Sequence, residues 1–165
     1  MKNKMKLAHM RTAFNYANCS SAIRLKVGSI VVKDDAIISI GYNGQPSGWD
    51  NVCENKVYMD SDAGGWLDID EVEAQWPFVD KEGRYALKTK PTVLHAESNA
   101  LMKLAKLKGG GKDAAIFVTH APCIDCAKSI YQAGITELYY SIAYRATDGV
   151  DFLKQCGIYV EQIET

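Results

Sequence analysis

The chain has 165 residues, of which 47% are hydrophobic and 24% are charged. This length and makeup predict one compact domain with a continuous core, and they exclude the disordered and fibrous classes. No run approaches the roughly 18 apolar residues that a membrane span needs, and the N-terminal stretch lacks the apolar run of a signal peptide. We therefore expect an intracellular, cytoplasmic protein that has no membrane partner.

Charge is distributed unevenly, although the formal net charge is only −1. Residues 1–47 carry seven Lys/Arg against two Asp/Glu, whereas residues 48–90 carry five Lys/Arg against ten Asp/Glu. With a pI near 6.3, a strong hold on a long nucleic acid is not expected. A local basic patch could still bind one small phosphorylated molecule.

The first 48 residues predict a helix, a hairpin and a loop. Apolar residues at three-to-four spacing indicate an amphipathic helix over residues 5–18. Two β-branched runs, residues 27–33 and 36–42, flank Asp34-Asp35 and predict a tight antiparallel hairpin. GYNGQPSG, residues 41–48, then indicates a loop whose backbone can approach a ligand closely.

Residues 48–90 carry all three tryptophans and half of the acidic residues, with no sustained helix or strand period. We interpret this stretch as a lobe inserted into a single domain that spans residues 1–165.

The second half of the chain alternates helices and strands. A helix is predicted from His95 to the glycines at 109–111, then a strand at 114–120 and a helix at 123–134. A strand at 135–144, a helix near 148–156 and a strand at 157–163 follow. This order predicts parallel strands between layers of helices, joined to the hairpin in one mixed sheet.

Two short motifs carry the chemistry, HAE at residues 95–97 and PCIDC at residues 122–126. H-x-E followed by P-C-x-x-C is the signature of zinc-dependent deaminases. Thiolates from Cys123 and Cys126 and the imidazole of His95 would hold a tetrahedral zinc on three sides and leave the fourth position for water. Glu97 could take a proton from that water and pass it to the substrate, so we predict Glu97 as the catalytic residue.

The local pattern around the cysteines also bears on His120, which lies three residues before the first of them. Pro122 suits the first turn of a helix, which would place both cysteines one turn apart on one face. Because Pro122 biases Ala121 away from helical geometry, His120 need not share that face. We therefore predict that His95 is the third ligand and that His120 is a pocket-edge or packing residue, with contact to the substrate as the less favoured alternative.

A CxxC pair alone also fits a redox pair or half of a structural zinc site. A structural site would need a fourth protein ligand, for which Cys156, Cys53 and Cys19 are the candidates. In an intracellular chain, the five cysteines favour metal ligation or core packing over disulfides. We expect Cys156 to be a core residue.

Five blocks follow one another along the chain, namely RLKVGSIVV, IGYNGQPSG, HAESNAL, VTHAPCIDCAKSIYQAGI and YSIAYR. In composition and order they resemble the blocks of the deoxycytidylate (dCMP) deaminases of the cytidine deaminase superfamily, and the likeness covers nearly the whole chain. The resemblance implies a three-layer α/β/α fold with a five-stranded mixed sheet. It also implies hydrolytic deamination of dCMP to dUMP, the precursor of thymidylate, with zinc on His95, Cys123 and Cys126 and a proton shuttle at Glu97.

A phosphorylated substrate of this kind needs cations, for which Arg24, Lys26 and Arg145 are the candidates. Each of them could instead be a solvated surface charge. Asn43 could hold the deoxyribose hydroxyl or be only a turn residue. Ala96, between the zinc-ligating histidine and the proton shuttle, is expected at the substrate as well.

In many members of this family, the loop around GYNG also belongs to an allosteric site, activated by dCTP and inhibited by dTTP, within a homohexamer. The resemblance therefore implies effector contacts at Gly41, Tyr42, Asn43 and Gly44, with Mg²⁺ accompanying the triphosphate, and a hexamer of this chain.

Some viral members hold a second zinc with two cysteines and a histidine, and Cys19 and Cys53 resemble that cysteine pair. All three histidines of the chain lie outside residues 48–90, so a second zinc is not expected here.

Other functions stay open on the sequence alone. A deaminase of a base in RNA or single-stranded DNA, or of another free cytosine nucleotide, would keep the zinc chemistry, and three tryptophans could stack bases. A non-catalytic nucleotide-binding regulator would keep the fold, but the intact HxE motif argues against it.

Overall fold

The computed structural model describes residues 1–60, 67–106, 110–144 and 146–164. Its centre is a sheet of five strands in the order β2-β1-β6-β7-β8. The strands are β1 (Gly28–Lys33), β2 (Ala36–Tyr42), β6 (Ala115–His120), β7 (Glu137–Ile142) and β8 (Tyr159–Gln162). β1 is antiparallel to β2 and to β6, whereas β6, β7 and β8 are parallel. The sheet is therefore mixed.

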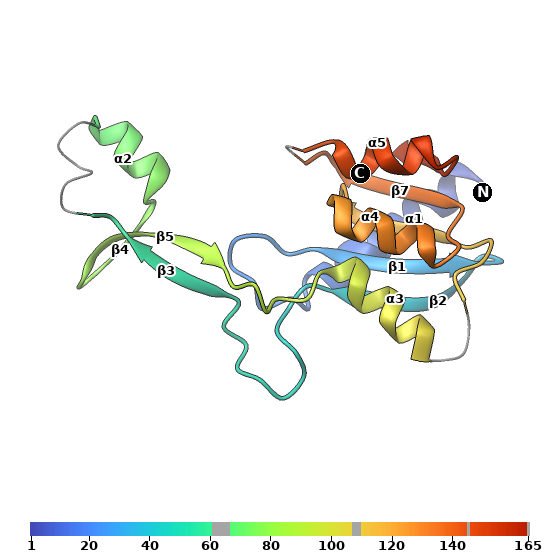
Figure 1. Cartoon of the computed structure of the whole chain (residues 1–165), viewed down its shortest axis with the longest axis horizontal. Coiled ribbons are helices and arrows are strands. Elements are labelled where there is room, and N and C mark those ends of the chain that lie inside the picture. Colours follow the sequence, from blue (N-terminus) through green and yellow to red (C-terminus); the bar gives the residue numbers. More distant parts are fainter. Residues whose placement is uncertain (61–66, 107–109, 145, 165) are drawn as a thin grey trace.

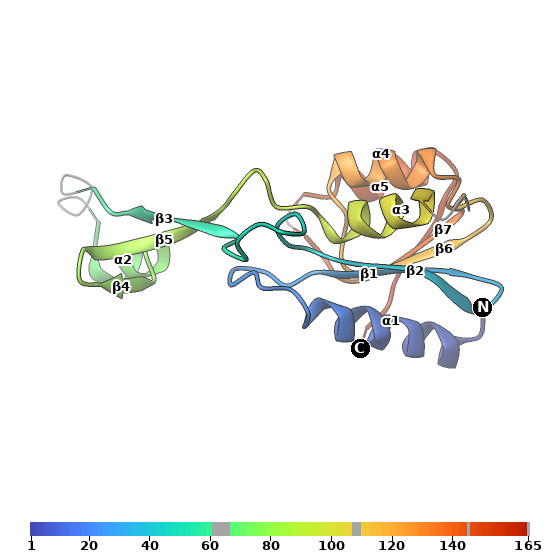
Figure 2. The ribbon, with the colours of Figure 1, turned by 90° about the horizontal axis from the view of Figure 1, so that it is seen from below.

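Helices cover both faces of this sheet, as Figure 2 shows. α1 (Asn3–Ala17) lies on one face, and α3 (Ala96–Lys106), α4 (Ile124–Gln132) and α5 (Asp148–Gln155) lie on the other. The predicted three-layer α/β/α class with a five-stranded mixed sheet is thus confirmed. None of the helices in the described part of the chain is long and apolar enough to cross a bilayer.

Alternating side chains of the central strands build one core on each face. Ile116 and Val118 of β6 join the cluster beneath α3, α4 and α5, while their neighbour Phe117 joins the cluster beneath α1. Successive residues of a strand point to opposite faces, so one apolar run supplies both cores. This explains why residues 114–118 are all hydrophobic, without alternation.

The β1–β2 hairpin turns at Asp34 and Asp35, which have φ values of 49° and 59°. Lys33 pairs with Ala36 across the turn. Two central residues with positive φ characterise the type I′ turn, and aspartate is among the residues that tolerate it. The expected tight hairpin is confirmed.

Gly41 of β2 lets α3 approach the sheet closely. A Cβ atom at this position would lie 2.1 Å from the carbonyl oxygen of Ala96 and 2.6 Å from the backbone nitrogen of Ala100. The absence of a side chain therefore sets the height of the helix that begins just after His95.

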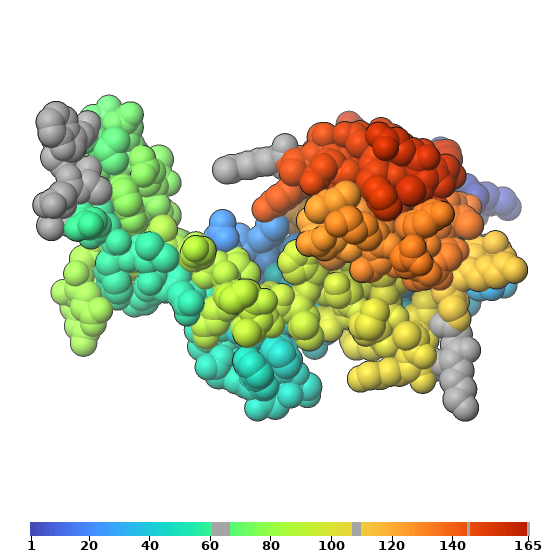
Figure 3. Space-filling model, in the orientation of Figure 1, coloured from blue at the N-terminus to red at the C-terminus, as the bar shows by residue number. Residues whose placement is uncertain are grey.

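Residues 54–89 contain a second sheet in the order β3-β5-β4, whose strands are all antiparallel. Its elements are β3 (Glu54–Tyr58), α2 (Ile69–Gln75), β4 (Phe78–Asp80) and β5 (Gly83–Thr89). We call residues 54–89 the lobe. Figures 1 and 3 show it projecting from the main body at the end opposite the chain's N-terminus. That the chain is one domain with this lobe inserted stays a prediction.

Candidate active site

Two helix starts bring three metal-ligating side chains together. His95 directly precedes α3, and its carbonyl accepts a hydrogen bond from the backbone of Asn99. Cys123 and Cys126 lie at the start of α4. His95 Nδ1 lies 3.7 Å from Cys123 Sγ and 3.3 Å from Cys126 Sγ, and the three ligand atoms all lie within 4.8 Å of one another.

These distances fit zinc. Tetrahedral zinc with Zn–S near 2.3 Å and Zn–N near 2.0 Å holds a sulfur and a nitrogen about 3.5 Å apart. Two thiols and one imidazole are also the ligand types that zinc prefers. Within the described part of the chain, this is the group of His, Cys, Asp and Glu side chains that could hold a metal ion.

Pro122 does not lie in the first turn of α4, contrary to the sequence-based expectation. The helix begins at Ile124, and Cys123 is its N-cap, with an extended ψ of 168° and a carbonyl that accepts from Ala127. The side chain of an N-cap residue lies beside the third helical residue, which here is Cys126. The two thiols therefore meet even though only one of them is inside the helix.

The two thiols have opposite pKa shifts. Hydrogen bonds with Cys126 and with His95 lower the pKa of the Cys123 thiol to about 3. The bond with Cys123, together with burial, raises the pKa of Cys126. The hydrogen bond with Cys123 also raises the pKa of His95. Both thiols lie beside the imidazole of His95, so both could ligate a metal as thiolates.

Glu97 lies in the first turn of α3 and is 4% exposed. Burial raises the pKa of its carboxyl above the ordinary value. A carboxyl with a raised pKa holds a proton more readily than an exposed one, which suits a group that must accept a proton and then donate it. It is two residues from His95, so the start of α3 places a metal ligand and a proton-transfer group side by side in the chain.

A cavity of about 530 Å³ opens over these groups. His95, Glu97 and Cys123 lie in its wall. The rest of its lining is Ala22, Arg24, Leu25, Val27, Asn43, Glu54, Thr89, Val93, Ala96, His120, Ala121 and Tyr144. Its volume lies within the range of about 300–1,000 Å³ that is usual for small-molecule sites.

Of the three candidate phosphate-binding cations, the described part of the structure places one at the cavity. Arg24 lines the cavity, and its Nη1 donates to Thr89 Oγ1 at 3.1 Å. Lys26 is exposed and is not among the described residues that line the cavity. Arg145 lies outside the described residues, although its neighbour Tyr144 lines the cavity.

Asn43 lines the cavity, but its side-chain amide already has protein partners. Its Oδ1 accepts from the backbone nitrogen of Val27, and its Nδ2 donates to the carbonyl of Leu25, both at 2.8 Å. Asn43 therefore holds residues 25–27, which follow Arg24, against the end of β2. Its side chain thus does more than form a turn.

The remaining residues of the predicted effector site lie beside the active site. The Tyr42 carbonyl accepts from Asn99 of α3, and Lys103 Nζ lies 5.6 Å from the centre of the Tyr42 ring. The backbones of Gly44 and Leu94 exchange two hydrogen bonds of 3.1 and 2.9 Å. The loop after β2 is thus tied directly to the residue before His95.

Sequence reasoning missed Glu54, Thr89 and Tyr144 at the cavity. Glu54 is 6% exposed, and its Oε1 accepts from the backbone nitrogens of Ile23 and Arg24 at 3.0 and 3.2 Å. It pairs with Thr89 at the base of the lobe. No local pattern indicates Glu54 or Thr89, because they reach the cavity through pairing between distant strands, and Tyr144 reaches it from the segment that follows β7.

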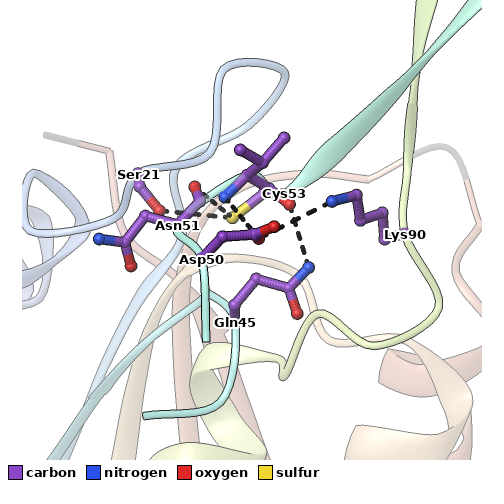
Figure 4. Close-up of polar contacts among 7 residues, drawn as sticks. Ser21, Gln45, Asp50, Asn51, Cys53 and Lys90 are labelled. Carbon is purple, nitrogen blue, oxygen red and sulfur yellow. Dashed lines mark hydrogen bonds and ion pairs between the residues drawn. The ribbon is translucent and has the colours of Figure 1, made fainter. Parts of the chain in front are cut away.

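Cys19 and Cys53 do not belong to a metal group in the described chain. Cys19 is exposed, whereas Cys53 is 1% exposed. Figure 4 shows Cys53 at the base of the lobe, where its Sγ lies 3.4 Å from Ser21 Oγ. Around it Gln45 donates to the carbonyl of Val52, and Lys90 forms an ion pair with Asp50. Cys156 is partly buried at the end of α5.

Comparisons with known proteins agree with this geometry. The model of the family "Cytidine and deoxycytidylate deaminase zinc-binding region" matches residues 3–142. Deoxycytidylate deaminase of Enterobacteria phage T4 is 31% identical over 171 residues, which cover 92% of this chain and 86% of that protein. ComE operon protein 2 of Bacillus subtilis is 34% identical over 146 residues, and the match spans 88% of this chain but only 64% of that protein.

A solved structure is similar along the whole chain. It is the dCMP deaminase of the cyanophage S-TIM5 in complex with dCMP and dUMP, with a TM-score of 0.77 and 40% sequence identity over 99% of both chains. The predicted resemblance is therefore confirmed, and the chain belongs to the cytidine and deoxycytidylate deaminase family.

Proposed function

We propose that the protein deaminates dCMP hydrolytically to dUMP and ammonia. The observation that carries this proposal is one cavity whose wall holds His95 and Cys123 of the metal-ligating group together with the buried carboxyl of Glu97. A buried acid beside an incomplete metal ligand set suits hydrolysis rather than structural support, because a structural zinc site closes with a fourth protein ligand. The likeness to a structure that contains dCMP and dUMP supports the choice of substrate.

His95, Cys123 and Cys126 would hold the zinc. When bound, the zinc would supply the Lewis acidity that makes a hydroxide nucleophile available near neutral pH. Glu97 would accept the proton that the attacking water loses and donate it to N3 of the cytosine ring, then take the proton of the new hydroxyl on C4 and deliver it to the departing amine as the C4 carbonyl forms. The burial of Glu97 keeps this proton inside the site.

Arg24 would contact the substrate phosphate. Thr89 fixes its guanidinium, Glu54 fixes its backbone, and Asn43 holds the carbonyl of the next residue, Leu25. This arrangement holds one cation at the cavity wall with little freedom left to lose on binding. Ala96 would contact the nucleotide from the start of α3, and the role of Lys26 and Arg145 in phosphate binding stays a prediction.

Ammonia release from dCMP, dCTP, deoxycytidine and a cytosine-containing single-stranded oligonucleotide tests the proposed function. We expect dCMP to be the preferred substrate by kcat/KM. Activity confined to the oligonucleotide would instead establish a nucleic-acid deaminase. An absence of ammonia from all four by zinc-loaded protein would favour a regulator that only binds nucleotides.

We also propose regulation by dCTP as activator and dTTP as inhibitor, with Mg²⁺ on the triphosphate. The paired hydrogen bonds between Gly44 and Leu94 support this, because a ligand at residues 41–44 would act on the backbone next to His95. Titration of dCMP deamination with each triphosphate, with and without Mg²⁺, checks it. A rate that neither triphosphate changes would exclude regulation by these effectors.

We further propose that the chain assembles as a homohexamer in which the lobe contacts a neighbouring copy. The lobe region is acidic and residues 1–47 are basic, so the two are complementary in charge. Ile69 and Val79 of the lobe are 66% and 63% exposed, which suits contacts with another surface. Figure 3 shows that much of the lobe surface stands clear of the main body.

A shortened lobe tests this assembly. Tyr58 and Tyr85 are cross-strand partners, so an Asn-Gly turn can replace residues 59–84 and leave Glu54 and Thr89 in the cavity wall. We expect a hexamer for the intact chain and a smaller species for this variant in analytical ultracentrifugation. A hexamer that survives the replacement would place the contacts elsewhere. The use of dUMP for thymidylate synthesis and the cytoplasmic location stay predictions.

A further inference from the structure

His120 lines the active cavity although it is outside the metal-ligating group. It is the last residue of β6 and is partly buried. Its Nδ1 lies 3.0 Å from the side-chain oxygen of Thr119. The chemistry that this ring can perform depends on which of its two nitrogens carries the proton.

The Thr119 hydroxyl determines the tautomer. Thr119 is fully buried, and its Oγ1 already accepts the backbone N–H of Gly28 at 3.1 Å. A buried hydroxyl also needs an acceptor for its own hydrogen. Among the described residues, the acceptor within reach is His120 Nδ1. The hydroxyl therefore donates to Nδ1, and the proton of the ring is on Nε2.

The ring is also held neutral. A proton on Nδ1 would leave the Thr119 hydroxyl without an acceptor in a fully buried position. Burial in addition lowers the pKa of His120. A neutral ring with a protonated Nε2 is a hydrogen-bond donor at that atom and cannot serve as a base there.

The Nε2–H group has no partner among the described residues and is not enclosed. The buried side-chain nitrogen and oxygen atoms that lack partners in that part of the chain are His9 Nε2, Ser29 Oγ and Gln45 Oε1. His120 Nε2 is not one of them, so it is open to the cavity that its residue lines.

We propose that His120 is a substrate-binding residue whose Nε2–H donates a hydrogen bond to an acceptor oxygen of the bound nucleotide. This inference rests on the proposed function. It adds a chain of hydrogen bonds from Gly28 to Thr119 to His120, which fixes the orientation of the ring and so of its Nε2–H donor. The acceptor is an oxygen of the phosphate or an oxygen of the nucleoside. Proton transfer remains with Glu97.

Two substitutions separate this role from a structural one. In His120→Gln the side-chain amide nitrogen can take the place of Nε2, whereas in His120→Asn it can take only the place of Nδ1. We expect His120→Asn to lower kcat/KM for dCMP about ten-fold, the size of one lost hydrogen bond, and His120→Gln to retain most of it. Both variants should keep a full complement of zinc.

Comparing dCMP with deoxycytidine as substrates identifies the acceptor, and the order of activity of the two variants tests the role of His120. A loss seen with dCMP but not with deoxycytidine assigns the acceptor to the phosphate, and an equal loss with both assigns it to the nucleoside. If His120 only supports Thr119, His120→Asn should be the better variant. That order, or wild-type activity in both variants, would overturn the proposal.

Nitrogen-15 NMR of the imidazole provides a readout that needs no turnover. We expect His120 to be the neutral Nε2–H tautomer at neutral pH, and dCMP to shift its Nε2–H resonance. A protonated Nδ1, or a resonance that dCMP leaves unchanged, would contradict the inference. A protein that binds dCMP with this shift but releases no ammonia would refute the proposed deamination and leave the role of His120 standing.

Discussion

The five-stranded sheet buries apolar side chains on both faces, whereas the lobe between Glu54 and Thr89 buries few. Twelve residues form the buried cluster beneath α3, α4 and α5, and eight form the cluster beneath α1. Among the described residues of the lobe, Val72 is the one buried hydrophobic side chain. The two regions therefore rest on different contacts.

Polar and aromatic contacts hold the lobe together. Lys56 forms an ion pair with Asp80 and lies 4.5 Å from the ring centre of Tyr85. Arg84 pairs with Glu73 at 2.6 Å. Exposed ion pairs contribute only about 0–1 kcal/mol each, whereas a buried aliphatic side chain contributes about 1.5–3 kcal/mol. We expect the main body, which is the five-stranded sheet with its helices, to be stable through its own core. We expect the lobe to need contacts with the main body or with a neighbouring copy to stay folded.

The largest effects should come from substitutions at the site that the body supports. His95→Ala should abolish zinc binding, because it leaves only two ligands for the metal. Glu97→Gln should keep the zinc and lower kcat by about 10²- to 10⁴-fold, as expected for loss of the proton shuttle. Zinc content by atomic absorption and ammonia release measure the two effects. His120→Ala is the matched control and should keep its zinc; if it loses zinc as His95→Ala does, the ligand set is wrong.

The next largest effect is expected from shortening an apolar side chain, which should destabilise the main body much more than the lobe. Leu104→Ala in the cluster beneath α3 should lower the free energy of unfolding by about 2–5 kcal/mol. Ile69→Ala in the lobe, where the side chain is 66% exposed, should change it by less than about 0.5 kcal/mol. Urea denaturation monitored by circular dichroism compares them. Equal losses would mean that Ile69 is as well buried in the folded protein as Leu104, either within the lobe or against a neighbouring copy.

Gly41→Ala should destabilise the protein by about 1–3 kcal/mol, because its Cβ would clash with the backbone of α3. The shift of α3 should also reduce zinc affinity, since His95 precedes this helix. Gly44→Ala is the control, because a Cβ there meets no atom within 4 Å. A Gly41→Ala protein as stable as Gly44→Ala would mean that β2 does not determine the height of α3.

The smallest effect concerns His9, whose ring centre lies 5.3 Å from that of Phe117 with the two planes tilted by 50°, and whose buried Nε2 has no partner in the described chain. Burial lowers its pKa in the folded state, and the charge of Asp35 opposes that shift. The folded protein thus disfavours the charged ring. The contribution of the neutral His9 ring to the free energy of unfolding is fully present above the unfolded pKa of about 6.5 and is lost as the pH falls below that value.

His9→Leu isolates this contribution. The difference in free energy of unfolding between wild type and His9→Leu should change below pH 6.5, with wild type losing more, and should be flat above it. A difference that stays constant across this range would show that His9 is as readily protonated in the fold as in the unfolded chain.

Sequence patterns were informative for the body and uninformative for the lobe for one physical reason. Hydrophobic residues recur with a helix or strand period when one face of the element is buried, and the lobe buries too few apolar side chains to show such a period. The signal that remained was Asp68-x-x-Glu71, which forms a reciprocal capping box at the start of α2. A local hydrogen-bond pattern of this kind predicts where a helix begins but not what the helix packs against.

The sequence by itself determined the order of elements outside the lobe, the Asp34-Asp35 turn and the ligand types at His95, Cys123 and Cys126, because these depend on neighbouring residues and on side-chain chemistry. Only the tertiary structure decided that Glu54 and Thr89 reach the cavity, that the Asn43 amide is already engaged, and that Thr119 orients His120. Each of these depends on strand pairing and packing between segments far apart in the chain, which no local pattern records.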